Sequence, residues 1–358
     1  MTAIAGLAAC NGDKLGPPIS SGQYDDPCDP NGGTGNTNTL APVDAGAVAL
    51  PLPGGSPGVG FDDLRFSATL GQLLVPAGRS GSLDLVDPSS EAIASIGGFS
   101  AEATFDGSDA FGVTSADEGG ALVYVADRTA GTLSVVDVHK KAVVAHAALA
   151  ATPGYVRYVA TTNEVWVTEP AKQQIEIFTP GATAGAAPTS AAVVAVPGGG
   201  GPESLAIDDT GKRAYTHTQT ATVAIDLAGR AVAASWPNGC ASSRGVAVDE
   251  AHGWVVSACQ EGRVIVLDAN KGGATIGSAT TGAGVDQIAY DADRTRVYVP
   301  SPTAGAVDVV ELAANGMPKA LGALQTASDS HCVVTAGAGS LFVCAPSQGA
   351  LLFVKDPF

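Results

Sequence analysis

A hairpin-like pattern recurs along this chain at nearly constant spacing, and this repetition restricts the possible folds most strongly. Each copy is an apolar run, a turn-rich break and a second apolar run, as in RVYVPSPTAGAVDVVEL and ALVYVADRTAGTLSVVDV. The second runs end at intervals of 50, 42, 47, 42, 43 and 44 residues. They close on Asp87, Asp137, Thr179, Asp226, Asp268, Glu311 and Lys355. Four short strands per repeat of this length are typical of propeller blades. The sequence therefore predicts an all-β, seven-bladed β-propeller.

The last repeat stops before a fourth strand can form, so its sheet needs a strand from elsewhere. The segment Ala45–Gly54 precedes the first repeat and is similar to the outer strands of the other repeats. Pairing the two chain ends in one blade removes the free sheet edges of an open ring. We therefore expect Ala45–Gly54 to lie beside Leu351–Val354 and to close one propeller domain over residues 41–358.

Composition agrees with this fold and excludes some partners. The chain has 46 Gly and 22 Pro, which suits many turns, and Asp residues at the strand ends are interpreted as turn formers. A formal net charge of −17 argues against nucleic acid as a partner. No apolar run reaches the roughly 20 residues of a membrane-spanning helix. We expect no cofactor, because the chain has no CxxCH motif and its glycine-rich segment at residues 197–202 lacks the Lys-Ser/Thr of a phosphate loop.

The first ten residues, MTAIAGLAAC, suggest a lipid anchor. Their apolar character and the ending LAAC resemble a bacterial lipobox, in which Cys10 is acylated, although the usual basic start of a signal peptide is missing. Residues 11–40 are rich in Gly, Asn, Asp, Ser, Thr and Pro, as in a flexible tether. We therefore expect a signal remnant at 1–10, a tether at 11–40, and an outer-membrane lipoprotein that faces the periplasm or the cell surface. The alternative is an N-terminal segment in which Cys10 occurs by chance.

The sequence of the hairpins, VYV followed by GTLSVVDV, resembles the YVTN-type repeat of seven-bladed propellers. The resemblance covers nearly all of the chain after the tether. It implies an envelope or surface location, and it concerns the residues that build blades, so it says little about a reaction.

Four cysteines are placed to form two disulfides. In HCVVTAGAGSLFVC a central turn brings Cys332 opposite Cys344 on neighbouring strands. Cys240 and Cys259 lie at the same end of another hairpin, whereas Cys28 is left over. Disulfides fit an oxidising compartment; buried free thiols are the alternative.

The candidate site lies where the innermost strands begin, at one mouth of the central channel. Alignment of repeats four to seven brings Glu203, Arg244, Asp286 and His331 to one equivalent position. Repeats one to three have apolar residues or glycine there, and neighbouring Arg65, Tyr155 and Arg157 complete the set expected to bind a ligand. A polar half-ring that faces an apolar half suits a pocket for a small molecule.

Three functions remain open for this mouth. The similar fold of seven-bladed lactonases implies hydrolysis, with Glu203 or His331 as general base and Arg244 holding an oxyanion. Glu203, Asp286 and His331 could instead hold a divalent metal. Charged residues also gather at wet channel mouths without any ligand. We therefore predict a binding or scaffold module for an envelope protein or a small ligand, with no enzyme activity expected, and keep the hydrolase and the metal-binding propeller as alternatives.

Overall fold

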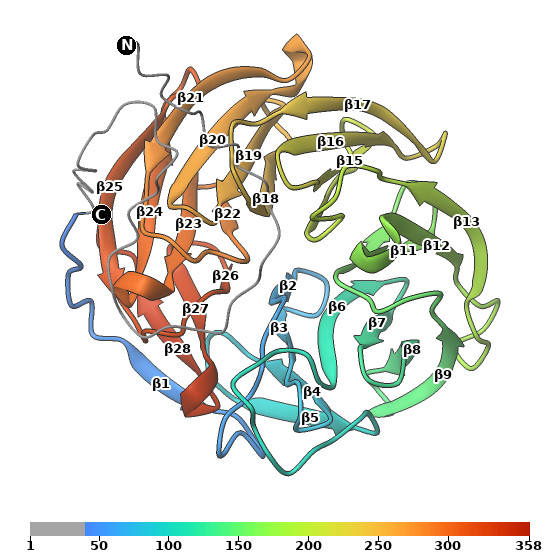
Figure 1. Cartoon of the computed structure of the whole chain (residues 1–358). Helices are drawn as coiled ribbons and strands as arrows, with labels where there is room; N and C mark the ends of the chain where they lie inside the picture. The colour runs from blue at the N-terminus through green and yellow to red at the C-terminus, as the bar shows by residue number, and fades with distance from the viewer. Residues whose placement is uncertain (1–39) are drawn as a thin grey trace, which may run out of the picture. The chain divides into compact units, whose positions relative to one another are not determined.

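The computed structural model describes residues 40–358, which form seven four-stranded antiparallel sheets around a central channel (Figure 1). This arrangement confirms the seven-bladed β-propeller. Among the described residues, no helix combines the length and apolar character needed to cross a membrane. The predicted signal remnant with Cys10, and the predicted tether up to residue 39, lie outside the described residues.

The strands follow the chain from the centre of each blade to its rim. Blade 1 contains β2 (Arg65–Ser67), β3 (Gln72–Pro76), β4 (Ser82–Val86) and β5 (Ile93–Gly97). Blade 2 contains β6 (Val113–Gly119), β7 (Leu122–Asp127), β8 (Thr132–Asp137) and β9 (Ala142–Ala148). Blade 3 contains β10 (Val156–Val159), β11 (Glu164–Glu169), β12 (Gln174–Thr179) and β13 (Thr189–Ala195). Blade 4 contains β14 (Leu205–Asp208), β15 (Arg213–His217), β16 (Ala221–Asp226) and β17 (Ala231–Pro237).

The remaining blades repeat this order, and the last one uses a strand from the N-terminal side. Blade 5 contains β18 (Ser243–Asp249), β19 (Trp254–Cys259), β20 (Arg263–Asp268) and β21 (Ala274–Thr280). Blade 6 contains β22 (Ala289–Asp291), β23 (Arg296–Ser301), β24 (Ala306–Leu312) and β25 (Pro318–Gln325). Blade 7 contains β26 (Val333–Thr335), β27 (Ser340–Ala345), β28 (Ala350–Lys355) and β1 (Val48–Pro51). Four short 3-10 helices follow second or third strands: η1 (Pro170–Lys172), η2 (Ala269–Lys271), η3 (Pro302–Ala304) and η4 (Pro346–Gln348).

The pairing of β1 with β28 closes the ring as the sequence predicts. Val48 lies opposite Phe353, and the antiparallel register continues to Pro51 opposite Ala350. Figure 1 shows β1 as the outer strand of the blade that holds the C-terminal strands. Because β1 pairs with β28, the C-terminal strand lies inside the sheet and its edge is covered.

The repeated VYV-like sequence pattern places large side chains between neighbouring sheets. Tyr124, Trp166, Tyr215, Tyr298 and Phe342 each occupy the third position of a second strand, and each is almost fully buried. Burial of such a side chain contributes about 1.5–3 kcal/mol. The recurring aromatic residue therefore contributes to the packing between blades.

Aspartates at the ends of third strands form turns, as the sequence predicts. The Asp87 carboxylate accepts hydrogen bonds from Ser89 N and Ser90 N at 2.8 and 3.0 Å, and Asp268 accepts from Asn270 N and Lys271 N. Hydrogen bonds from the Ser89 hydroxyl and these backbone groups lower the pKa of Asp87 to about 2. These carboxylates therefore have a structural role.

Candidate functional site

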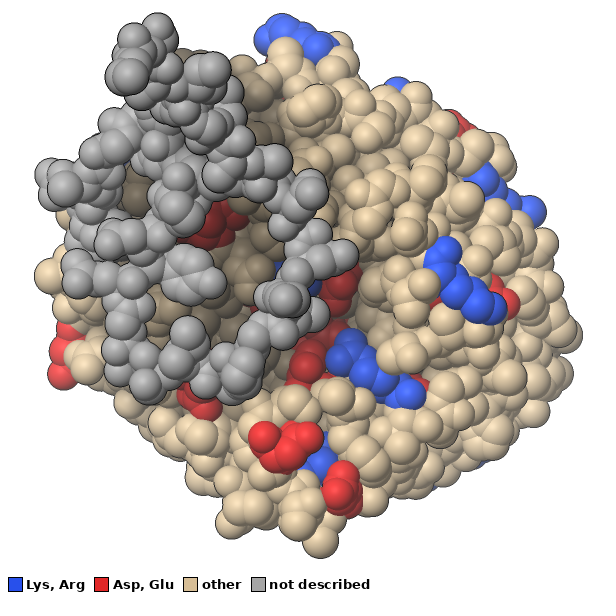
Figure 2. All heavy atoms as spheres, in the orientation of Figure 1, with Lys and Arg blue, Asp and Glu red and all other residues tan. Residues whose placement is uncertain are grey.

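A large cavity opens at the mouth of the channel where the innermost strands begin. Its volume is about 960 Å³, within the range of small-molecule sites. Residues just before the first strands and just after the second strands form its wall, and Figure 2 shows acidic and basic side chains together around this central hollow. The charged and polar residues of its wall include Asp109, Arg128, Glu203, Arg244, Gln260, Asp286, Asp329 and His331.

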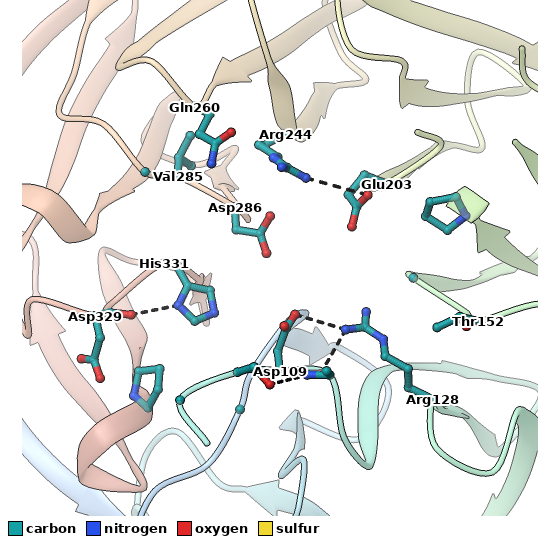
Figure 3. Close-up of a pocket in the computed structure, with 18 of the residues that line it drawn as sticks. Asp109, Arg128, Thr152, Glu203, Arg244, Gln260, Val285, Asp286, Asp329 and His331 are labelled. Atoms are coloured by element: carbon teal, nitrogen blue, oxygen red, sulfur yellow. Dashed lines mark hydrogen bonds and ion pairs between the residues drawn. The ribbon is translucent and has the colours of Figure 1, made fainter. Parts of the chain in front are cut away.

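The structure brings the four aligned residues of repeats four to seven to this cavity. Glu203, Arg244, Asp286 and His331 all line it, from four consecutive blades (Figure 3). Asp286 N donates to His331 O at 3.1 Å, and Arg244 Nη1 lies 3.9 Å from Glu203 Oε2. The equivalent position identified from the repeats is therefore a real structural position at the channel mouth.

Blades 1 and 2 supply charges where the sequence predicted an apolar half, so that part of the expectation is wrong. The Arg128 guanidinium contacts Asp62 Oδ2 at 2.5 Å and Asp109 Oδ2 at 3.2 Å. Oxygens of Asp62, Asp109 and Asp286 lie within 4.8 Å of one another. The cavity is thus charged on both sides, and carboxylates outnumber guanidinium groups.

Two sequence signals could have revealed these residues. The interval of 50 residues between the first two repeats marks a longer connection, and this connection carries Asp109. Arg128 directly follows β7, and Gln260 and Pro346 hold the same position after β19 and β27. An alignment of second-strand ends, in addition to first-strand starts, would have placed Arg128 at the mouth.

Arg65, Tyr155 and Arg157 lie at a different place from the one the sequence suggested. They line a second cavity of about 350 Å³ that extends along the innermost strands, deeper in the channel. Arg65 pairs with Asp117 at 3.2 Å and keeps a partly exposed side chain. Tyr155 is buried, with the Arg157 guanidinium 4.9 Å from its ring centre. These residues therefore belong to the channel interior, apart from the four residues at the mouth.

A buried ion pair joins the inner ends of several blades. Asp63 accepts two hydrogen bonds from Arg157, at 2.5 and 2.9 Å, and further ones from Gln287 Nε2 and Ser115 Oγ. Burial alone would lower the pKa of Arg157, but the Asp63 carboxylate raises it above its ordinary value. We call Asp63, Ser115, Arg157 and Gln287 the channel plug; it joins blades 1, 2, 3 and 6.

The carboxylates of the cavity are held in an unfavourable environment for negative charge. Burial raises the pKa of Asp62, and the neighbouring Asp286 and Asp109 carboxylates add to the rise although Arg128 opposes it. Burial likewise raises the pKa of Glu203 and of Asp286. The ionised forms of these groups therefore gain from any additional positive charge in the cavity.

Arg244 is fixed through its backbone, whereas its side chain points into the cavity. The Arg244 carbonyl oxygen accepts a hydrogen bond from Ser204 Oγ at 2.6 Å and lies 3.0 Å from His217 Nδ1. Burial lowers the pKa of His217 to about 4, so its ring is neutral at pH 7. The neutral ring donates from Nδ1 and accepts at Nε2 from Ser257 Oγ, which is 3.0 Å away. This network sets where the guanidinium group enters the site.

Both ring nitrogens of His331 contact backbone carbonyl oxygens, so the side chain links neighbouring segments at the channel mouth. Its Nδ1 lies 2.8 Å from Asp329 O and its Nε2 lies 2.8 Å from Phe61 O (Figure 3 shows the first contact). Each ring nitrogen therefore points at a backbone carbonyl oxygen and not at the open cavity, which disfavours His331 as a base for water in the cavity. Among the predicted general bases this leaves Glu203, and hydrolysis stays a prediction.

The predicted metal set and the observed carboxylate cluster share one member. Both nitrogens of His331 are engaged, and the oxygens that approach one another closely belong to Asp62, Asp109 and Asp286. Carboxylate oxygens suit hard cations and ammonium groups alike. Of the predicted ligands Glu203, Asp286 and His331, the cluster therefore contains Asp286.

Both predicted cysteine pairs are confirmed, and both lie at the rim of the cavity. Cys240 and Cys259 are bonded with a Cα–Cα distance of 5.2 Å, and Cys332 and Cys344 with one of 5.5 Å. Cys259 directly precedes Gln260 of the cavity wall, and Cys332 directly follows His331. The disulfides therefore restrain blades 5 and 7 next to the site, while Cys28 lies outside the described residues.

Comparison with known proteins identifies the fold and no further relationship. No protein-family model and no curated protein matches the sequence. A chain of hydrazine synthase from Kuenenia stuttgartiensis superposes with a TM-score of 0.68 at 12% identity, over 84% of this chain and 96% of that chain. A chain in a crystal structure of the mitotic checkpoint complex gives a TM-score of 0.68 at 14% identity, over 97% and 99%. At such identities the likeness concerns the β-propeller fold, and function has to be argued from the site.

Proposed function

We propose that this protein is a binding module that holds a small, positively charged ligand in the cavity at the channel mouth. The supporting observation is that Asp109, Glu203 and Asp286 line one cavity of about 960 Å³, with the buried Asp62 carboxylate next to Asp109 and Asp286. A cavity of this size fits a small molecule better than the surface of a partner protein.

The electrostatics favour a cation over an anion. Burial raises the pKa of three of these carboxylates, and the guanidinium groups of Arg128 and Arg244 compensate their ionised forms only in part. A bound cation would supply that compensation, whereas an anion would be repelled by the same groups. The ligand class that fits is an organic ammonium ion or a divalent cation.

The proposed location is the bacterial cell envelope, with an anchor at Cys10. The lipobox-like LAAC, the tether-like composition of residues 11–40 and the resemblance to YVTN-type repeats support it. Two disulfides in the propeller fit the same oxidising compartment. Cys10→Ala should move the protein from the membrane fraction to the soluble fraction of its own cells. Equal membrane association of the two forms would refute the anchor.

Titration calorimetry of the propeller with calcium, magnesium and a series of alkylamines tests the binding function. Asp286→Asn should weaken cation binding at least tenfold, which corresponds to about 1.4 kcal/mol. Asp293→Asn is the matched control, because it makes the same change in an exposed turn at the other end of β22. If no cation binds, or if both variants bind equally well, the proposal is wrong.

Binding should also depend on pH in a defined direction. The raised pKa values of Asp62, Glu203 and Asp286 mean that these groups take up protons at higher pH than ordinary carboxyls. Since only the ionised forms attract a cation, affinity should fall during acidification before ordinary carboxyl groups titrate. A cation affinity that stays constant from pH 8 to pH 4 would contradict this reasoning.

A further inference from the structure

Three charged side chains in the cavity, those of Arg244, Glu203 and Asp286, have no hydrogen-bond partner among the described residues. The Arg244 guanidinium has Glu203 as its nearest ionic partner, at 3.9 Å, which is too long for a hydrogen bond. No described donor reaches the Asp286 carboxylate, whose own backbone N–H is held by His331 O at 3.1 Å. Both side chains project into the same space (Figure 3). The site therefore presents one available guanidinium group and two available carboxylates, of which Asp286 is the one without an ion pair among the described residues.

Arg244 and Asp286 differ from Arg128 and Asp329 nearby, and Glu203 is the carboxylate that already faces Arg244. Arg128 already donates to Asp62 and Asp109, and it also donates to Pro153 O at 3.2 Å. Asp329 accepts a hydrogen bond from Ser347 N at 2.6 Å. Arg128 is therefore engaged within the protein, and Asp329 is engaged through Oδ2 while its Oδ1 is buried without a partner. The side chains of Arg244 and Asp286 retain their full hydrogen-bonding capacity.

The pair selects the charge pattern of the ligand. A simple cation would satisfy Asp286 but would be repelled by Arg244, and a simple anion would meet four carboxylates. A molecule with an ammonium group and a carboxylate a few atoms apart satisfies both groups. The planar guanidinium can bind a carboxylate through two parallel hydrogen bonds, and the backbone of Arg244 is already fixed by Ser204 and His217.

We propose that the cavity binds a zwitterion of the α-amino acid type, with its ammonium group on Asp286 and its carboxylate on Arg244. This inference rests on the proposed binding of a positively charged group at the same site. The remaining volume lies between Phe105, Pro170, Val285 and Pro346, which form an apolar wall for the body of the ligand.

A thermal-shift screen of the protein-forming L-amino acids is the first step of the test. The strongest binder is then compared by calorimetry with the amine and the carboxylic acid that share its side chain. We expect the amino acid to bind at least tenfold more tightly than its amine, and the carboxylic acid to show no binding.

Variants separate the two charges. Arg244→Gln should reduce the amino acid to the affinity of its amine, while the amine binds as well as before or better. Arg263→Gln in the same blade makes the same change outside the cavity and should leave both affinities unaltered. Melting curves of both variants check that the propeller stays folded.

The outcomes distinguish this inference from the function on which it rests. If amines or metal ions bind through Asp286 and no amino acid binds more tightly than its amine, the zwitterion proposal is wrong and cation binding stands. If neither amino acids nor cations bind, both proposals are wrong. If Arg244→Gln lowers amine and amino acid binding equally, Arg244 does not hold the carboxylate.

Discussion

Replacement of Asp63 by Asn should destabilise the propeller strongly, because this carboxylate is the only negative partner of a buried guanidinium within the channel plug. Asp63 is fully buried, and the Arg157 side chain is 5% exposed. Their two contacts, at 2.5 and 2.9 Å, tie blade 1 to blade 3. The neutral amide would remove the carboxylate that contacts Arg157 directly and would leave Asp117 as the remaining carboxylate that stabilises this buried charge.

The expected size follows from this burial. Loss of one partner of a buried ion pair costs about 3–5 kcal/mol. Unfolding entropy of about 2.1 cal/mol/K per residue gives roughly 0.7 kcal/mol/K for a domain of this length, so a loss of 4 kcal/mol lowers Tm by about 6 °C. Urea unfolding, followed by tryptophan fluorescence, measures the free energy directly.

A double-mutant cycle separates the pair from its surroundings. Arg157→Met alone should also destabilise, whereas Asp63→Asn combined with Arg157→Met should lose less than the sum of the single changes by at least about 2 kcal/mol. The exposed Asp293→Asn should change stability by less than about 0.5 kcal/mol. Additive single changes, or a loss below about 1 kcal/mol for Asp63→Asn, would refute the assignment of the plug.

Other parts of the fold give further predictions. Burial keeps His217 neutral down to about pH 4, whereas its ring in the unfolded chain takes up a proton below about pH 6.5. The unfolded state is therefore favoured as the pH falls from 6.5 to 4, and about 3 kcal/mol of stability should be lost over this range. His217→Gln should lack this part of the acid loss, and identical urea profiles of the two proteins at pH 7 and pH 4 would disprove it. Arg79 is buried and donates to five backbone carbonyls, four of them in residues 54–58, which follow β1 in the sequence. Arg79→Lys should therefore lower the free energy of unfolding in urea by about 2–3 kcal/mol, and an unchanged free energy would exclude this role. Replacing both Cys332 and Cys344 by Ala removes a cross-link between residues 12 positions apart and should lower the free energy of unfolding by about 3 kcal/mol. Unchanged stability would contradict this prediction. Deletion of residues 1–51 should expose the edge of β28 and cause aggregation in size-exclusion chromatography; a monomeric, stable product would refute the closure argument.

The blade architecture could be read from the sequence because its determinants are local. Apolar alternation, turn residues and the aromatic third position act within one hairpin, and seven hairpins repeat them. The pair Cys332 and Cys344 was found in the same way, since a single turn fixes which residues face each other. The closing strand followed from counting strands in the last repeat.

The candidate site was found in part. Glu203, Arg244, Asp286 and His331 share one position in the repeat, so alignment of the repeats revealed them. Asp109 lies in a connection that the other repeats lack, and alignment has nothing to compare it with. The apolar half expected from repeats one to three was wrong for this reason.

The sequence by itself determined the number of blades, their strand order, the closing pair and the two disulfides, because short-range patterns and strand counts specify them. Tertiary structure alone decided how charges from different blades meet on the channel axis. His331 meets the Phe61 carbonyl 270 residues away, and Arg157 meets Asp63 across 94 residues. Such contacts exist only once the ring is closed, since closure sets the distance and direction between side chains that no local pattern relates.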